Sequence, residues 1–198
     1  LVAYGGPGQL ASVFVRGTES RHTLLLIDGV PYGSATAGIP IWDAVPVEMI
    51  ERVEVLKGSA SALYGSEGIG GVIQIFTRRA NAAPQQQVSV SGGSQGLFTA
   101  GANGSWQWGQ SWASAGLQHR QLTGFSATNP QVPFGSYNPD RDGFEQNSLK
   151  LAGGTQWSPD WRGEFSVLSS DGRSRFDDGP GVDARNALRS EVASVTVE

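Results

Sequence analysis

Acidic side chains gather in two stretches of the second half of the chain. Residues 138–143, Asn-Pro-Asp-Arg-Asp-Gly, place Asp140 and Asp142 two positions apart. Asp177 and Asp183 follow in a later polar stretch. Calcium takes six to eight oxygen ligands, mostly carboxylates and carbonyls on adaptable loops, and an EF-hand would need a twelve-residue loop ending in Glu. These residues therefore suggest a calcium site built from loops, with Asp residues that only form turns as the alternative.

The chain offers little for enzymatic chemistry. It has no Cys, and its two His residues, His22 and His119, lie far apart. No Ser, His and Asp follow an order typical of hydrolases. The glycines of residues 65–71 precede a strand-like run and lack the Lys-Ser/Thr of a phosphate-binding loop. We therefore expect no enzyme, and we expect these glycines to serve turns and packing.

The first half of the chain predicts a small α+β sheet. Val53–Leu56 and Val72–Phe76 are β-type runs on either side of a short helix, expected over Ala60–Tyr64. Ser12–Arg16 predicts a short strand. Thr23–Ile27 is a continuous apolar run, which favours a strand buried on both faces.

The pattern changes after a Pro- and Gln-containing linker at residues 81–87. Beyond it, apolar side chains alternate with polar or small ones, as along Trp112–Thr123. Alternation of this kind indicates strands with two different faces. About five such strands are expected over residues 88–198.

The connections between these strands alternate in length. Gly109-Gln110 and Ser158–Asp160 predict tight turns, whereas Gly124–Asn147 and Ser170–Ser190 predict connections of about twenty residues each. Short turns at one end and long loops at the other are typical of an outer-membrane β-barrel. An aromatic girdle belongs beside such turns. Five tryptophans lie there: Trp106, Trp108, Trp112, Trp157 and Trp161.

Composition sets further limits. The net charge of −4 gives no basic face for nucleic acid. The sequence shows no signal peptide and no run of about 18 apolar residues that would predict a membrane helix. It begins without Met and stops within an alternating run, so we expect a fragment of a longer protein.

Several motifs of the first half resemble the plug domain of TonB-dependent outer-membrane receptors, and their order and spacing match across residues 1–80. These motifs are Phe14–Gly17, Leu25–Gly29, Ile50–Gly58 and Ala62–Ile75. Within that family the chain is most similar to receptors for vitamin B12 (cobalamin). The residues behind this similarity are Gly5–Leu10, Arg16–His22 and the small-residue loop after Asp28-Gly29.

The resemblance implies a two-part architecture. Residues 1–80 would form an α+β plug that lacks its beginning, with a small mixed sheet and short helices. Residues 81–87 would be the linker. Residues 88–198 would form the first antiparallel strands of a transmembrane β-barrel, which in the whole protein would have about 22 strands and enclose the plug.

The resemblance further implies transport without chemistry on the substrate. The protein would be a monomer in the outer membrane of a Gram-negative cell, surrounded by outer-membrane lipid, and would import cobalamin or a related corrinoid. Energy would come from the inner membrane through TonB, which would contact a plug segment missing from the sequence. No cofactor would be required for chemistry, and Ca²⁺ would bind in the barrel loops.

Two plug loops, Tyr4–Ser12 and Tyr32–Trp42, would face the substrate. Their small residues would let a bulky corrinoid lie against the backbone, and their polar side chains would hydrogen-bond it. The expected binding residues are Tyr4, Gly8, Gln9, Leu10, Ala35, Thr36, Ala37, Gly38 and Ile39. The alternative is that both are ordinary exposed loops.

The resemblance also assigns a role to the acidic stretches. Cobalamin receptors order their substrate loops with calcium, and four residues match their acidic positions: Asp140, Asp142, Asp177 and Asp183. Ser126 stands where a further acidic ligand is expected. One of the calcium sites is therefore expected to be weakened or lost.

Two other functions remain open from the sequence. A ferric-siderophore or haem receptor would share the plug motifs, since these are common to the whole family. A soluble β-rich carbohydrate-binding or adhesin-like module would share the alternating strands, with the tryptophans in its core.

Overall fold

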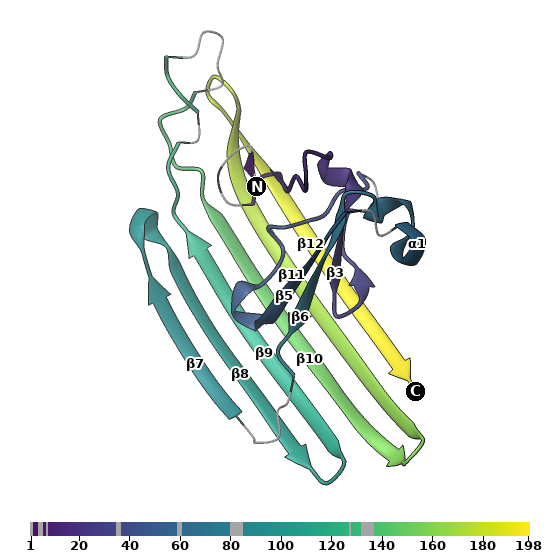
Figure 1. Cartoon of the computed structure of the whole chain (residues 1–198). Helices are drawn as coiled ribbons and strands as arrows, with labels where there is room; N and C mark the ends of the chain where they lie inside the picture. Colours follow the sequence, from purple (N-terminus) through teal and green to yellow (C-terminus); the bar gives the residue numbers. More distant parts are fainter. Residues whose placement is uncertain are drawn as a thin grey trace.

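The computed structural model describes residues 2–3, 6, 8–34, 37–58, 61–79, 85–126, 128–131 and 137–198. Most of the structure is β, arranged as a small four-stranded sheet and a large six-stranded one. Figure 1 shows the small sheet and its short helices lying against one face of the large sheet. The expected plan of a small mixed sheet followed by antiparallel strands is confirmed.

The small domain, residues 2–79, is built on the sheet β4-β3-β6-β5. Its strands are β3 (Thr23–Ile27), β4 (Val30–Pro31), β5 (Ile50–Lys57) and β6 (Gly71–Thr77). Strands β3 and β6 are parallel, and the other two pairs are antiparallel. Every residue of β3 is buried, so the prediction of a strand covered on both faces is confirmed.

Short elements connect these strands. They are β1 (Val2–Ala3), β2 (Ala11–Ser12), η1 (Ser20–His22), η2 (Val47–Met49), α1 (Ser61–Tyr64) and η3 (Ser66–Gly68). Helix α1 falls where the sequence predicts it, although Ala60 lies outside the described residues. The strand predicted over Ser12–Arg16 is wrong, because it ends at Ser12 and the chain turns at Arg16 (φ +52°) and Gly17 (φ +78°). None of the described helices has the length and apolar character needed to cross a bilayer.

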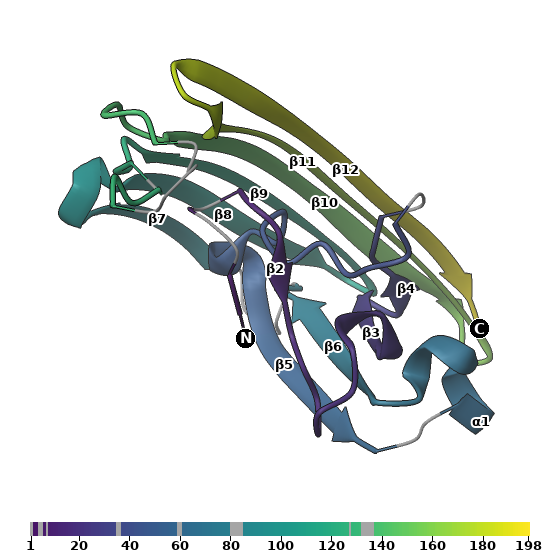
Figure 2. The same cartoon turned by 90° about the horizontal axis from the view of Figure 1, so that it is seen from above.

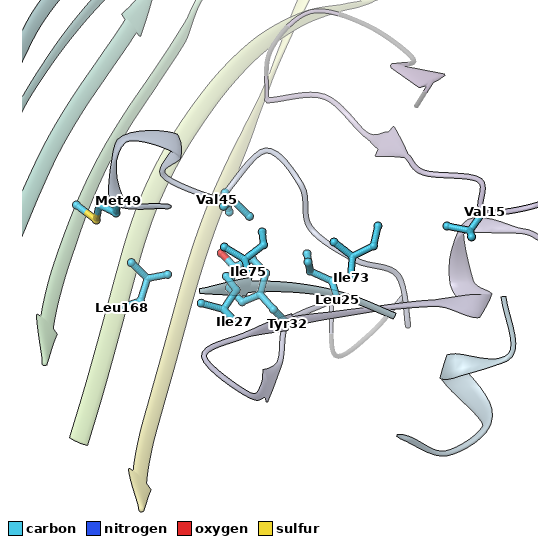
Figure 3. Packing of buried hydrophobic residues seen from close by; sticks show 10 residues of the cluster. Val15, Leu25, Ile27, Tyr32, Val45, Met49, Ile73, Ile75 and Leu168 are labelled. Atoms are coloured by element: carbon cyan, nitrogen blue, oxygen red, sulfur yellow. The ribbon is translucent and has the colours of Figure 1, made fainter. Parts of the chain in front are cut away.

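The apolar core lies on both faces of β3. On the face toward the large sheet, Leu25 and Ile27 pack with Ile73, Ile75 and Met49 (Figure 3). On the other face, Leu24 and Leu26 pack with Val72. The first cluster continues into the large sheet through Leu168, Leu188 and Val192. Full burial of one such side chain contributes about 1.5–3 kcal/mol, so shared packing holds the two parts together.

The large sheet is an antiparallel meander in which each strand pairs with the next along the chain. Its strands are β7 (Gln85–Gly92), β8 (Phe98–Trp108), β9 (Ser111–Leu122), β10 (Phe144–Ser158), β11 (Trp161–Gly179) and β12 (Val182–Val197). Figure 2 shows these strands running past the small domain on one side.

The large sheet has six strands, whereas the sequence pattern predicted about five. The stretch from Val88 to Trp108 holds two strands, β7 and β8, separated by the 3₁₀ turn η4 (Ser94–Gly96). In this turn Gln95 and Gly96 both adopt positive φ and reverse the chain. Strand β7 also begins at Gln85, so residues 85–87 are strand rather than linker, while residues 81–84 lie outside the described residues.

The prediction of a long connection over Ser170–Ser190 is wrong. Strands β11 and β12 continue through it and meet in a tight turn at residues 180–181, where Gly181 has φ +72°. Charged residues such as Arg175 and Asp177 interrupt the apolar alternation here, so the sequence pattern does not indicate strands. The other long connection, between β9 and β10, and both predicted tight turns are confirmed.

The two faces of the large sheet differ as the alternation predicts. Side chains such as Ser114 and Gln118 lie buried toward the small domain, whereas Leu117 and Val90 are exposed on the outer face. Trp106, Trp108, Trp157 and Trp161 are 42–62% exposed beside the short turns, so they form no closed core. Trp112 differs from them, because it lies with Asp28, Arg79 and Lys150 around a small cavity between the two sheets.

Candidate functional site

The long connection between β9 and β10 is fastened to the tip of the β11–β12 hairpin. Asn138 makes the attachment and is only 6% exposed. Its side-chain amide donates hydrogen bonds to the carbonyl oxygens of Gly179 (3.2 Å) and Val182 (3.4 Å). Its side-chain oxygen accepts one from the backbone N–H of Gly181 (2.5 Å). One buried side chain thus fixes a loop against a hairpin at this end of the sheet.

This attachment brings three predicted calcium ligands together. Carboxylate oxygens of Asp140, Asp177 and Asp183 lie within 4.8 Å of one another. Two oxygens bound to one calcium ion at about 2.4 Å each can be at most about 4.8 Å apart. One oxygen of Asp177 accepts hydrogen bonds from the Thr128 hydroxyl and from the backbone N–H of Asn138 (3.3 Å). The group therefore has a spacing that a single cation can bridge.

Two carboxylate oxygens of this group have no protein partner. The Oδ1 atoms of Asp140 and Asp177 are buried without a hydrogen bond, and so is the hydroxyl of Ser126 on the same connection. A buried polar atom left unpaired costs about 1–3 kcal/mol. Adjacent carboxylates also repel one another unless a proton or a cation intervenes. The donor set, all oxygen and mostly anionic, fits calcium.

The fourth predicted ligand lies apart from this group. Asp142 is 5% exposed, and its backbone N–H donates to the carbonyl oxygen of Phe125 (3.2 Å). The structure therefore brings together three of the four predicted acidic residues. The sequence spacing suggested that Asp140 and Asp142 bind the same ion. In an irregular loop, however, side chains two residues apart need not point in the same direction.

The first predicted substrate loop rests against the inner face of β11. The Ser174 hydroxyl donates to the carbonyl oxygen of Gly8 (3.1 Å), and the Gln9 side-chain amide donates to the Ser174 hydroxyl (3.4 Å). Ser174 lies three residues before Asp177, so this loop and the acidic group share one end of the large sheet. Leu10 is half exposed, and Tyr4 lies outside the described residues.

Three residues that the sequence did not single out anchor this region. Burial raises the pKa of Asp43, while a hydrogen bond from the Gly8 backbone and the charge of Arg120 lower it in part. The backbone carbonyl of Asp43 accepts a hydrogen bond from the Gln146 side chain (3.0 Å). Alternation places Gln146 and Ser174 on the inner face, but nothing in the sequence pairs them with the loops.

The second predicted substrate loop is closed at its base by an antiparallel bridge between Gly33 and Pro40. The backbone N–H groups of Ser34 and Gly38 bond to the carbonyls of Ile39 and Ser34, both at 2.9 Å, and Ala37 N–H bonds to the Ser34 hydroxyl (3.1 Å). Ala37 and Gly38 are exposed at the tip, and Ala35 and Thr36 lie outside the described residues. The hollow beside it holds only about 170 Å³. Ligand pockets are typically about 300–1,000 Å³, so a large ligand would have to lie over the loop.

Charged contacts hold the exit of the small domain to the large sheet. Lys150, 3% exposed on the inner face of β10, donates to the carbonyl oxygen of Arg78. Arg79 pairs with Glu164 of β11 (2.7 Å). Asp28 accepts a hydrogen bond from the last backbone N–H of β6 (2.9 Å). The segment that leaves β6 is thereby fixed to two strands of the large sheet.

Comparison with known proteins places these features in context. Residues 1–72 match the family described as TonB-dependent receptor plug domain. The chain is 38% identical over 182 residues to the vitamin B12 transporter BtuB of Photobacterium profundum, covering 91% of this chain. It is 32% identical over 199 residues to a BtuB of Vibrio vulnificus, covering 98% of this chain. The matches span 29% and 30% of those two proteins, so the chain corresponds to under a third of their length.

Solved structures show the same fold. The ferric enterobactin receptor PfeA of Pseudomonas aeruginosa superposes with a TM-score of 0.70 at 19% identity, over 92% of this chain and 31% of the receptor. The ferric yersiniabactin receptor FyuA of Yersinia pestis gives a TM-score of 0.68 at 22% identity, over 88% of this chain and 29% of the receptor. Likenesses at this identity concern the fold and not the ligand.

Proposed function

Because this chain belongs to the TonB-dependent receptors of the outer membrane, we propose that the protein containing it imports cobalamin or a related corrinoid. The small domain serves as the plug, and the large sheet as part of the barrel wall. The observation behind this proposal is the identity of 38% with a vitamin B12 transporter over 91% of the chain, which includes both parts. The solved siderophore receptors share only 19–22% identity and support the fold alone.

The geometry supports a receptor that holds its substrate without altering it. The plug loops around Gly8 and Ala37 present backbone and small side chains, against which a bulky rigid ligand can lie. The acidic group of Asp140, Asp177 and Asp183 lies at the same end as the Gly8 loop and is suited to fixing the loop above it. TonB, acting on the plug from the periplasm, would supply the energy for release and import.

Ligand binding tests the proposed substrate. Full-length receptor in outer-membrane vesicles should bind radiolabelled cyanocobalamin, and an excess of ferric enterobactin should not displace it. Ala37→Trp should weaken this binding, because an indole at the exposed loop tip occupies the space of the ligand. Binding of the siderophore in place of cobalamin would overturn the assignment, and unchanged affinity of Ala37→Trp would remove this loop from the site.

We also propose that Asp140, Asp177 and Asp183 bind calcium. The support is their mutual spacing and the two buried, unpaired Oδ1 atoms. At least three further oxygens would have to come from the Ser126 hydroxyl, backbone carbonyls or water, since each carboxylate offers one ligand atom and calcium takes at least six oxygens. Ser126 supplies a neutral hydroxyl where a carboxylate would bind more strongly, so the affinity should be modest.

Calcium titration of the full-length receptor by calorimetry tests this site. Asp177→Asn should lower the affinity at least about tenfold, because it removes the charge of one of the two ligands with a buried unpaired oxygen. Asp178→Asn is the matched control, since Asp178 is exposed beside it and outside the group. Absence of calcium heat in the wild type, or equal losses in both variants, would contradict the proposal.

A further inference from the structure

The inner face of β7–β9 carries a strip of small and uncharged polar side chains. The strand register places its members side by side, with Gly101 between Ser89 and Gln118. We call the following residues the neutral strip: Gln87, Ser89, Gly101, Asn103, Ser105, Ser114, Gly116 and Gln118. Of the residues that face inward from these three strands, all of them described, only Arg120 is charged. The strip therefore offers hydrogen bonds without favouring ions of either sign.

The neutral strip differs from the part of the wall on which the plug core rests. Leu168, Leu188 and Val192 of β11 and β12 pack with the apolar cluster of the plug. Within the strip, Gly101 and Asn103 are only half-buried. Apolar packing therefore attaches the plug chiefly to β11 and β12, and the contact over β7–β9 is the one more easily opened.

Two polar atoms of the strip are buried without a hydrogen-bond partner. They are the hydroxyl oxygen of Ser114 and the side-chain oxygen of Gln118, and both side chains are more than nine-tenths buried. Folded proteins leave few such groups unpaired, because these groups have lost their bonds to water and gained none in return. Both oxygens accept hydrogen bonds, so the strip is suited to a ligand that donates them.

The plug closes the strip near the short turns. The terminal methyl group of Met49 lies 3.6 Å from the place of a Cβ at Gly116, and Figure 3 shows Met49 within the core cluster. The guanidinium group of Arg78 donates to the side-chain oxygen of Gln87 (2.6 Å). The cavity lined by these two plug side chains and by Ser114 holds only about 50 Å³. One water molecule takes about 30 Å³, so nothing larger passes until both contacts are released.

We propose that the substrate crosses the receptor along the neutral strip, between plug and wall, and that Met49 and Arg78 form the gate at its periplasmic end. The path starts at the end of the wall where the Gly8 loop rests and finishes beside the short turns. A corrinoid suits this path, because the uncharged amides on its rim can donate to the oxygens of Ser114 and Gln118. An anionic ferric chelate would meet no cation along the strip. The inference rests on the proposed import of cobalamin.

Cysteine accessibility during transport tests the path. Ser114→Cys is placed in a cysteine-free full-length receptor, and Ser170→Cys is the matched control, since Ser170 is likewise buried but lies two residues from Leu168, where the plug core packs. A membrane-impermeant maleimide is added outside cells that are transporting cyanocobalamin. Ser114→Cys should be labelled at least about tenfold faster in cells with TonB than in cells without it, and Ser170→Cys should show no difference. Labelling of Ser114→Cys that does not depend on TonB, or faster labelling of Ser170→Cys in its place, would overturn the path.

A bulky side chain in the strip provides a second test. Asn103→Trp should lower cobalamin accumulation at least about tenfold while surface binding stays at the wild-type level, because an indole there fills the strip beside the cavity. Ala102→Trp is the matched control, since Ala102 is exposed on the outer face of the same strand, and it should transport normally. Normal accumulation in Asn103→Trp would overturn the path. Absence of binding and accumulation in the wild type would instead overturn the proposed import itself.

Discussion

Gly8 shows how closely the plug loop fits the wall. Its φ of +82° belongs to the left-handed region, and a Cβ there would lie 2.4 Å from the Phe144 ring and 2.8 Å from Ser174. Both features exclude a side chain. The glycine therefore allows the loop to approach β10 and β11 closely enough for the bonds made by Ser174.

Gly8→Ala should loosen this loop. The strained backbone costs about 1–3 kcal/mol, and the methyl group has no room against the ring. We expect faster hydrogen exchange at Gln9 and Leu10 in the full-length receptor and weaker cobalamin binding. Gly6→Ala is the matched control, because a Cβ at Gly6 meets nothing within 4 Å. Identical exchange in both variants would contradict a tight fit.

The sequence identified residues that could act as oxygen ligands, but it did not identify the residue that holds them in place. Asp140, Asp177 and Asp183 were chosen as oxygen donors, and the structure places them together. Asn138, which brings two segments together through the hairpin tip, has no signature in the sequence. Its importance comes from three backbone groups, more than forty residues away, that happen to meet its amide.

The exit of the plug is fastened to the wall by polar contacts. It follows β6 and is held by Lys150, Glu164 and Asp28. Lys150 is one of only two lysines in the chain. Its ammonium group is buried against the carbonyl of Arg78, so its removal would leave that carbonyl unpaired.

Lys150→Met should free this exit segment. Loss of a hydrogen bond to a charged group costs about 1.5–3 kcal/mol, and the methionine retains most of the side-chain volume. We expect amides of residues 76–79 to exchange at least about tenfold faster in the full-length receptor. Lys57→Met, at an exposed lysine on β5, should leave them unchanged. Unchanged exchange in Lys150→Met would show that packing alone holds the segment.

Strands marked by a run or an alternation of apolar side chains were predictable, and the polar ends of strands were not. The apolar run at Thr23–Ile27 predicted β3, and the alternation along Trp112–Thr123 predicted β9. Both predictions come close to the bounds that the structure shows. The outer parts of β11 and β12 carry mostly polar, charged or small side chains on both faces, so no apolar period marks them. Their register depends on pairing with each other, which a single sequence does not reveal.

The whole molecule consists of a plug fitted to one part of a curved wall. The sheet has two open edges, β7 and β12, within the described structure, and its outer face exposes Val88, Val90 and Val195. Unpaired edges and apolar faces of this kind need to be covered by further strands or other apolar surface. The function therefore belongs to the full-length receptor.

TonB-dependent uptake of cobalamin in living cells tests whether this chain comes from a cobalamin importer. The full-length receptor is expressed in Gram-negative cells that lack their own cobalamin receptor, with and without TonB. We predict that both strains bind radiolabelled cyanocobalamin at the surface, and that only the strain with TonB accumulates it. Accumulation that is equal without TonB, or absent in both strains despite surface expression, would contradict the claim that this plug and wall belong to a cobalamin importer.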